Sequence, residues 1–283
     1  MPLAKCDMLP LKEWPLATRQ QIIGVFTDID DTLTTDGTIT PDALQALHDL
    51  KAAGYAVIAI TGRPVGWSEP FARDWPVDAI VAENGSIALF AGQNLRTNGT
   101  LRPSILRGVL SKSYQSGATT RQRNYAHLQA VLARVEREVQ GAVRSTDSAG
   151  RETDIAIDHS EFTHLPPAKI TQVVHIMQSE GLQATISSIH INGWIGAHNK
   201  LQGAHWIVQQ LLNRDLSKEM NRWAYVGDST NDQLMFEAFE SSIGVANIER
   251  FLPELSHLPR YIATQERGAG FAEVAACLAA VVR

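Results

Sequence analysis

Two pairs of aspartates in this sequence have the type and spacing to bind a divalent cation. Asp28 and Asp30 stand at the end of the apolar run 22–28, and residues two apart in a strand point the same way. Asp228 and Asp232 follow a second apolar run, and their spacing of four residues puts both on one face of a helix. Carboxylates held close together raise each other's pKa, so the cluster needs a compensating cation. Mg²⁺ fits, because it binds a few carboxylates together with water and phosphate oxygens.

Groups suited to phosphate binding occur in two other segments. Thr61, Gly62 and Arg63 close a further apolar strand with a hydroxyl group and backbone N–H groups that we expect to point into the same cleft. Lys200 opens a predicted helix and supplies a cation, with an ordinary surface position on that helix as the alternative. For Arg63 the sequence leaves open a contact with phosphate and a structural salt bridge.

The elements that must position these residues follow an α/β order. In the first part of the chain, the sequence pattern predicts strands at 22–28, 55–61 and 78–85, which alternate with helices at 41–53 and 67–75. The same order returns later, with predicted elements at 200–213, 223–229, 231–240, 242–246, 261–263 and from Gly270. Ligands of open parallel sheets bind beyond the carboxyl ends of the strands, which is where the aspartates stand. If the first and fourth core strands are neighbours, these carboxylates converge on one spot.

The middle of the chain has a different pattern. It begins with a loop-like stretch, in which one or two strands fit within 94–112, and continues with half-polar strands and helices at 122–139, 152–158, 166–180 and 182–194. This pattern predicts an α+β cap inserted into a Rossmann-like, doubly wound parallel core. The expected division is a core of 1–90 and 195–283, in which 1–21 is an N-terminal extension, and a cap of 91–194.

Polar residues alternate along the cap segment 187–194, which we expect to be a strand. Ser188, His190 and Asn192 share one face of it, and this face is either exposed to solvent or covers the active site and contacts substrate hydroxyls. With Arg63, these three are the candidate specificity residues. The row Glu152, Asp154 and Asp158 has the same two interpretations.

Composition excludes several classes of protein. A formal charge of −5 and a pI near 6.0 argue against nucleic acid as a partner. No stretch approaches the ~20 apolar residues of a membrane span, and prolines and an acidic residue interrupt the N-terminus where a signal peptide is apolar. The only cysteines, Cys6 and Cys277, are near opposite ends of the chain, so we expect no disulfide framework and a cytoplasmic location. The oligomeric state is not predicted.

Four motifs that follow one another along the chain resemble, in type and in order, those of the haloacid dehalogenase superfamily of phosphohydrolases. The matching segments are DIDDT (28–32), TGR (61–63), Lys200 and GDSTND (227–232). ENG (83–85) and the position of the inserted domain resemble the Cof-type, or type IIB, branch, which has a large α/β cap and includes sugar phosphatases. The resemblance covers the core, whereas the cap matches in position and size.

The resemblance implies catalytic roles for the first motif. Asp28 would be the nucleophile that forms an aspartyl-phosphate, and Asp30 would protonate the leaving alcohol and then activate water. Mg²⁺ would bind to Asp28, the backbone carbonyl of Asp30 and Asp228, with Asp232 bound directly or through water. The family usually has Gly at the position of Asp31, which we expect to point away from the metal and to cap the following turn.

The resemblance also implies the phosphate site and the reaction. Thr61, Gly62 and Lys200 would hold phosphate oxygens, and Asn231 would orient Lys200 or its own loop. The implied activity is Mg²⁺-dependent hydrolysis of a small phosphorylated metabolite, such as a sugar or polyol phosphate. The alternatives are a phosphomutase of the phosphomannomutase type and a catalytically silent phosphometabolite-binding protein. The expected partner is that metabolite, with no nucleic acid and no membrane.

Overall fold

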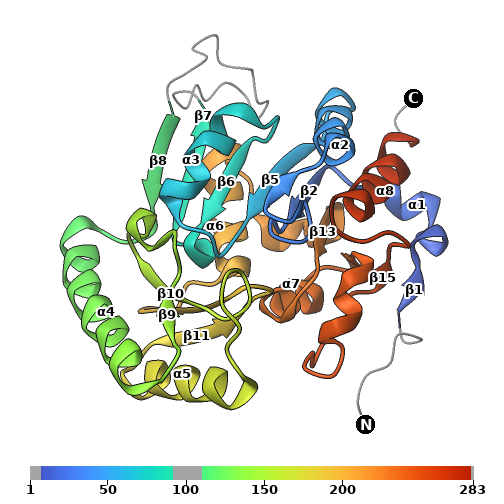
Figure 1. The fold of residues 1–283 in the computed structure, drawn as a ribbon. Helices are drawn as coiled ribbons and strands as arrows, with labels where there is room; N and C mark the ends of the chain where they lie inside the picture. The colour runs from blue at the N-terminus through green and yellow to red at the C-terminus, as the bar shows by residue number, and fades with distance from the viewer. Residues whose placement is uncertain (1–7, 92–109, 282–283) are drawn as a thin grey trace.

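The computed structural model describes residues 8–91 and 110–281, which form a large sheet covered by helices and a smaller sheet beside it (Figure 1). The strands of the large sheet are β1 (Leu9–Pro10), β2 (Gly24–Thr27), β5 (Ala56–Ile60), β6 (Ala79–Ala82), β7 (Ile87–Ala91), β8 (Leu110–Tyr114), β13 (Trp223–Gly227), β14 (Ser241–Gly244) and β15 (Tyr261–Ile262). Their order is β1-β15-β14-β13-β2-β5-β6-β7-β8. Neighbours from β1 to β6 are parallel, whereas β6–β7 and β7–β8 are antiparallel.

Helices cover both faces of this sheet. They are α1 (Leu16–Arg19), α2 (Pro41–Ala52), α3 (Val65–Asp74), α6 (Lys200–Leu212), α7 (Gln233–Ala238) and α8 (Arg267–Ala279). Helices α2, α3 and α8 contribute to the hydrophobic cluster on one face, and α6 and α7 to the cluster on the other. Strand β2 is buried along its whole length, as expected for a strand covered on both sides. The predicted doubly wound α/β core is confirmed.

Short elements connect this framework. They are the 3-10 helices η2 (Leu11–Glu13), η3 (Glu83–Gly85), η5 (Leu216–Lys218), η6 (Met220–Arg222), η7 (Thr230–Asp232) and η8 (Ala246–Phe251), and the hairpin of β3 (Thr34–Thr35) and β4 (Thr38–Ile39). The stretch predicted as a helix at 231–240 is thus η7 followed by the shorter α7. The N-terminal extension contributes β1, which pairs with β15 at the edge of the sheet.

The smaller sheet forms the predicted α+β unit. Its elements are β9 (Val143–Arg144), β10 (Asp154–Asp158), β11 (Gln183–Ile186), β12 (His190–Trp194), α4 (Ala118–Glu138), α5 (Pro167–Ser179) and the 3-10 helix η4 (Ser148–Gly150). The strand order is β11-β12-β10-β9, and all pairs are antiparallel. Hydrophobic residues of the sheet pack against α4 and α5, which in Figure 1 lie on its outer side, away from the large sheet.

Three details differ from the sequence prediction. The segment 187–194 is not one strand, because Ser187 donates its N–H to the carbonyl of His190 in a tight turn between β11 and β12. Ser188 therefore lies in a turn rather than on a strand face. Helix α4 begins at Ala118, before the predicted 122. Strand β8 belongs to the large sheet although it falls within 91–194, so the division of the chain into core and cap at 90 and 195 stays a prediction.

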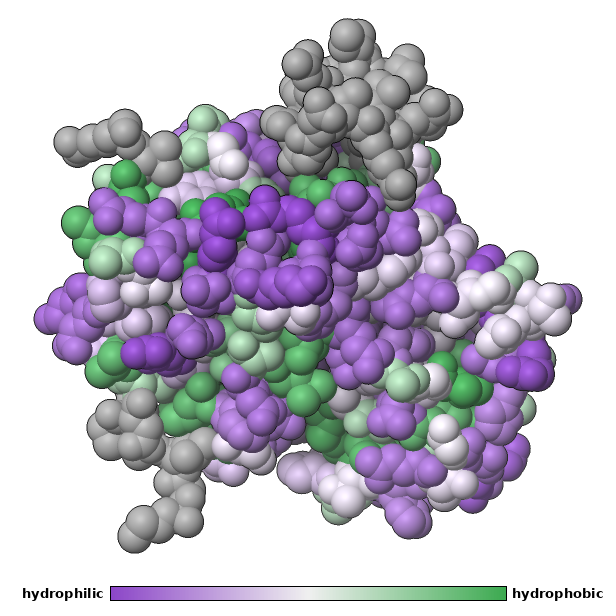
Figure 2. All heavy atoms as spheres, turned by 180° about the vertical axis from the view of Figure 1, so that it is seen from behind, coloured by the Kyte–Doolittle hydropathy of each residue, from purple (hydrophilic) through white to green (hydrophobic). Residues whose placement is uncertain are grey.

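Hydrophilic side chains predominate on the face seen in Figure 2, and hydrophobic ones form separate patches. Among the described residues, no helix combines the length and hydrophobicity needed to cross a bilayer. Cys277 is a half-buried free thiol, and Cys6 and most of the segment 94–112 lie outside the described residues.

Candidate active site

Three aspartates converge at the carboxyl ends of two adjacent parallel strands. Strand β13 pairs with β2, with Val226 opposite Thr27, so the two Asp motifs leave the sheet side by side. Carboxylate oxygens of Asp28, Asp228 and Asp232 lie within 4.8 Å of one another, and all three side chains are buried. The first and fourth core strands are therefore neighbours, which is the condition under which the carboxylates converge.

The electrostatics of this cluster favour a bound cation. Burial raises the pKa of Asp28 to about 7, with Lys200 lowering it and Asp232 and Asp30 raising it further. Burial also raises the pKa of Asp228 well above its usual value, and Asp232 and Asp28 add to the effect. The carboxylates are therefore under-compensated by the protein alone, and a hard divalent cation such as Mg²⁺ fits the oxygen donors that they offer.

Asp232 differs from the other two because each of its oxygens accepts hydrogen bonds from two donors in the protein. Oδ1 accepts hydrogen bonds from Lys200 Nζ at 2.6 Å and from the Tyr225 hydroxyl group. Oδ2 accepts from the backbone N–H groups of Asp228 at 2.9 Å and Ser229 at 3.1 Å. Of the two alternatives for Asp232, contact through water fits this arrangement better than direct metal binding. Asp28 and Asp228 are the carboxylates suited to direct contact.

Lys200 is a buried cation beside Asp28 rather than a surface residue. It is the first residue of α6 and is only 3% exposed. Its Nζ donates to Asp28 Oδ1 at 2.8 Å and to Asn231 Oδ1 at 3.2 Å. Asn231 Oδ1 also accepts from the Ser229 hydroxyl group of its own loop at 3.0 Å, so it contacts both of the groups named for it. Burial lowers the pKa of Lys200, but Asp232 and Asp28 outweigh burial and raise it above the usual value, so the amine stays charged.

A close backbone contact places the start of α6 at the site. Gly85 has a φ of +109°, and a Cβ atom built on it would lie 2.3 Å from the carbonyl oxygen of Asn199. Asn199 is the N-cap of α6, and its side chain accepts the N–H of Gln202 at 2.9 Å. Only glycine allows η3 and α6 to approach this closely, and the approach sets the position of Lys200.

The segment after β5 offers fewer phosphate donors than expected. The N–H of Thr61 donates to the carbonyl of Val81 at 2.9 Å, and the N–H of Arg63 donates to Thr61 Oγ1 at 3.0 Å. Both N–H groups therefore have acceptors within the protein, which corrects the expectation that they point into the cleft. Gly62 remains as the candidate backbone donor, and its carbonyl accepts from Arg151 at 3.0 Å and from Asn192 at 3.2 Å.

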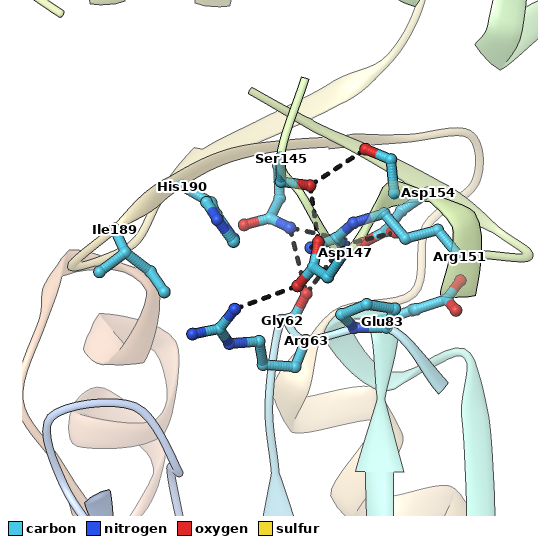
Figure 3. A network of polar contacts seen from close by, with 12 residues as sticks. Gly62, Arg63, Glu83, Ser145, Asp147, Arg151, Asp154, Ile189 and His190 are labelled. Atoms are coloured by element: carbon cyan, nitrogen blue, oxygen red, sulfur yellow. Dashed lines mark hydrogen bonds and ion pairs between the residues drawn. The ribbon is translucent and has the colours of Figure 1, made fainter. Parts of the chain in front are cut away.

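Arg63 forms a network of ion pairs between the two sheets (Figure 3). Its Nε lies 2.9 Å from Asp30 in the core, and its terminal nitrogens lie 3.1 Å from Asp147 and 2.7 Å from Glu161 in the cap. Figure 3 shows its guanidinium group directed toward Asp147, which also accepts a hydrogen bond from Ser145. Of the two alternatives for Arg63, the structure shows the salt bridge.

The predicted cap residues face the core but contact protein groups. His190 Nε2 lies 2.8 Å from a carboxylate oxygen of Glu161, and Asn192 donates to the Gly62 carbonyl. Their exposed fractions are 2% and 1%, so this face of β12 is not exposed to solvent. Ser188 is buried in the turn, where its carbonyl accepts from the Ser160 hydroxyl at 2.7 Å.

The acidic residues Glu152, Asp154 and Asp158, on or next to the neighbouring strand β10, lie in three different environments. Glu152 lies before β10 and accepts from Lys112 at 2.8 Å. Asp154 is fully buried and accepts from Arg151 at 2.8 Å. Asp158 accepts three backbone N–H groups of the following loop. Asp154 and Asp158 are buried, the Glu152 side chain is 38% exposed, and each of the three has a structural partner.

The comparisons with known proteins agree with this geometry. The family model described as haloacid dehalogenase-like hydrolase matches residues 25–257. The chain belongs to the haloacid dehalogenase-like hydrolases. No curated protein sequence matches it significantly. The resemblance that the motifs carry, and the prediction of a hydrolase of this type, are confirmed.

Several solved structures share the fold of this haloacid dehalogenase-like hydrolase at low sequence identity. Protein 0175 of Thermoplasma acidophilum has 16% identity and a TM-score of 0.65, with 89% of this chain and 96% of that chain covered. The sucrose-phosphatase of Synechocystis sp. has 16% identity and a TM-score of 0.61, with 91% and 98% covered. The C-terminal domain of trehalose-6-phosphate phosphatase from C. albicans has 11% identity and a TM-score of 0.64, with 97% and 98% covered.

This haloacid dehalogenase-like hydrolase departs from the usual motif at Asp31. The residue has a φ of +55°, a conformation that glycine adopts freely. Its carboxylate contacts Arg250 at 2.7 Å and Arg267 at 3.2 Å instead of capping the following turn. Arg250 also lies 3.3 Å from Asp228, and Asn247 donates to the same Asp228 oxygen at 3.0 Å.

Sequence reasoning missed several residues at this site. Asn247 and Arg250 lie in η8, a segment without a motif, and the sequence carries no signal for them. For Tyr225 the sequence did contain a signal. A buried tyrosine hydroxyl group needs a hydrogen-bond partner, and Tyr225 lies in an apolar run three residues before Asp228.

Proposed function

We propose that this protein is a Mg²⁺-dependent phosphatase that hydrolyses a small phosphorylated metabolite, a sugar or polyol phosphate, through an aspartyl-phosphate on Asp28. The observation that carries the proposal is the buried contact of 2.8 Å between Lys200 Nζ and Asp28, next to Asp228. A carboxylate that can attack phosphorus and a fixed cation that can hold phosphate oxygens are thus adjacent. Solved structures of sugar phosphatases with the same fold support the substrate class.

The proposed reaction has two steps, in which Asp28 and Asp30 have different roles. In the first, a carboxylate oxygen of Asp28 attacks phosphorus, the bond to the leaving oxygen breaks, and Asp30 gives its proton to the departing alcohol. In the second, Asp30 takes a proton from water, the water oxygen attacks phosphorus, and inorganic phosphate leaves with Asp28 restored. Lys200 and Thr61 hold the phosphate oxygens. Asp28, Asp228 and the backbone carbonyl of Asp30 would hold Mg²⁺, which would supply positive charge to stabilise the transferred phosphoryl group.

The position of Asp30 matters for this assignment. Its carboxylate lies on the cap side of the site, where Arg63 binds both of its oxygens at 2.9 and 3.0 Å. The guanidinium group fixes the orientation of this carboxylate. We propose that 91–194 acts as the cap over this site and that the protein is cytoplasmic.

A phosphate-release assay tests the proposal. Acetyl phosphate, an aryl phosphate and a panel of phosphorylated sugars and polyols are incubated with the purified protein, with Mg²⁺ and after chelation. The proposal predicts release from all three classes only with Mg²⁺ and fastest release from a sugar or polyol phosphate. No release from any substrate would support the binding-protein alternative instead.

A further inference from the structure

A cleft of about 310 Å³ lies between the two sheets and reaches the proposed catalytic centre. From the core, Asn84, Lys200 and Asn231 line it, and from the cap Gln183, Thr185 and Trp194. Lys200 connects the cleft to the reaction, because its Nζ also contacts Asp28. The volume is at the lower end of the range for small-molecule sites, which suits a group of about one sugar ring.

The cap side of the cleft is one face of the β11–β12 hairpin. Gln183 and Thr185 alternate along β11 and so point the same way, and Gln183 lies directly opposite Trp194 of β12. This face carries amide, hydroxyl and aromatic groups, which are the groups that bind hydroxyls and the apolar faces of a sugar ring. Ser188 and His190 do not line the cleft. Asn192 and Arg63 are also absent from its lining, so a specificity role for the four residues named from the sequence stays a separate prediction.

Two buried polar atoms beside the cleft have no hydrogen-bond partner among the described residues. They are the Thr185 hydroxyl oxygen and Nε2 of His198, which also line this space. Buried polar atoms in folded proteins normally have a partner, so an unpartnered hydroxyl next to a cleft points to a ligand that supplies one. Trp194 is already satisfied, because its indole N–H donates to the carbonyl of His198 at 2.8 Å.

The charge of the cleft distinguishes between classes of ligand. Among the described residues that line it, Lys200 is the only one with a permanent charge, and Asp28 and Asp232 already share its ammonium group. Burial lowers the pKa of His198 to about 4, so this imidazole is neutral near pH 7. A second phosphate in the cleft would lose its hydration without a counter-ion, which is strongly unfavourable.

We propose that this cleft binds the leaving group of the substrate and selects a neutral, polyhydroxylated group, with Thr185 and Gln183 as specificity-determining residues. This inference rests on the proposed phosphatase function and narrows its substrate class to monophosphates of neutral sugars or polyols. It also disfavours the phosphomutase alternative, because a mutase must retain a sugar bisphosphate whose second phosphate would occupy the cleft.

The test compares substrates that differ in the charge of the leaving group. Rates of phosphate release are measured for hexose 6-phosphates, hexitol 6-phosphates, hexose 1,6-bisphosphates and acetyl phosphate, which is too small to fill the cleft. Thr185→Val removes the hydroxyl group at nearly constant shape and is expected to lower kcat/KM for the preferred monophosphate by about 5- to 100-fold. Acetyl phosphate hydrolysis is expected to change by less than about twofold, since its leaving group makes no such hydrogen bond.

Two further variants separate specificity from a folding defect. Gln183 is exposed at the edge of the cleft, so Gln183→Arg adds a cation without disturbing the core and is expected to raise the ratio of bisphosphate to monophosphate activity. Thr171→Val, on the outer helix α5, is the matched control and is expected to leave all substrates unchanged. Equal losses for acetyl phosphate and hexose phosphate in Thr185→Val, or a wild-type preference for bisphosphates, would overturn the inference. If even acetyl phosphate releases no phosphate, the proposed function itself fails.

Discussion

Replacing Arg63 by Met tests the ion-pair network between core and cap. The Arg63 side chain is 5% exposed and faces Asp30, Asp147 and Glu161, whose own side chains are 14%, 10% and 17% exposed. Met retains much of the volume but removes the cation, so three largely buried carboxylates lose a positive partner, although Arg151 stays beside Asp147 and His190 beside Glu161. Removing one partner of a buried ion pair typically costs about 3–5 kcal/mol of unfolding free energy.

The ionisation of Asp147 supports a loss of unfolding free energy of this size. Although burial raises its pKa, Arg151, His190 and Arg63 together lower it to about 2. The carboxylate therefore remains ionised at neutral pH when Arg63 is absent. A decrease of this size corresponds to a fall in Tm on the order of 10 °C for a protein of this length.

Urea unfolding followed by circular dichroism measures the effect. Arg73→Met is the matched control, because Arg73 pairs with Glu69 at 3.5 Å on a side chain that is 48% exposed, and such pairs contribute less than about 1 kcal/mol. The phosphate-contact alternative makes the opposite prediction for Arg63→Met. An unchanged urea midpoint together with a raised KM for acetyl phosphate would refute the structural role that we assign to Arg63.

Three other outcomes are expected. Phosphate release should stop on chelation and return when Mg²⁺ is added, and full activity after exhaustive chelation would contradict the metal assignment. Burial lowers the pKa of His198 from 6.5 to about 4, so as the pH falls the imidazole takes up a proton in the unfolded chain before it does so in the folded protein. The unfolding free energy should therefore decrease by up to about 3 kcal/mol between pH 6.5 and 4, and urea titrations of His198→Gln should lack this part of the decrease; equal slopes would refute it. Gly85→Ala should cost on the order of 3 kcal/mol and lower activity, because its Cβ would collide with Asn199, whereas Gly54→Ala, with a φ of +88° and open space, should show only the smaller cost of backbone strain. Equal urea midpoints for the two glycine variants would contradict the steric argument.

The core of the site was predictable because each motif stands at the end of a strand. Apolar runs identified β2 and β13, and the parallel order of the elements implied that their carboxyl ends meet at one edge. The motifs thus placed Asp28 and Asp228 at the same edge of the sheet. The position of Lys200 at the start of a helix made it a candidate cation, but only the resemblance favoured it over an ordinary surface lysine.

The contacts of the cap were not predictable in the same way. Arg63 meets Asp147 and Glu161, which lie 84 and 98 residues further along the chain, and no local pattern encodes such pairings. The alternation in 187–194 suggested one strand, but Ser187–His190 forms the turn of a hairpin whose other half is β11. In β11 the alternation of polar Gln183 and Thr185 with apolar neighbours was visible in the sequence. The sequence alone could not show which polar row faces the cleft.

The central claim is that Asp28 carries the phosphoryl group. Wild-type protein is mixed with acetyl phosphate and Mg²⁺, quenched in acid within a single turnover, and digested for peptide mass spectrometry. The account predicts a phosphoryl group on the carboxylate of Asp28, its absence in Asp28→Asn, and its presence in Asp36→Asn, whose exposed carboxylate lies outside the site. A phosphoryl group on any other residue, or wild-type phosphate release by Asp28→Asn, would contradict it.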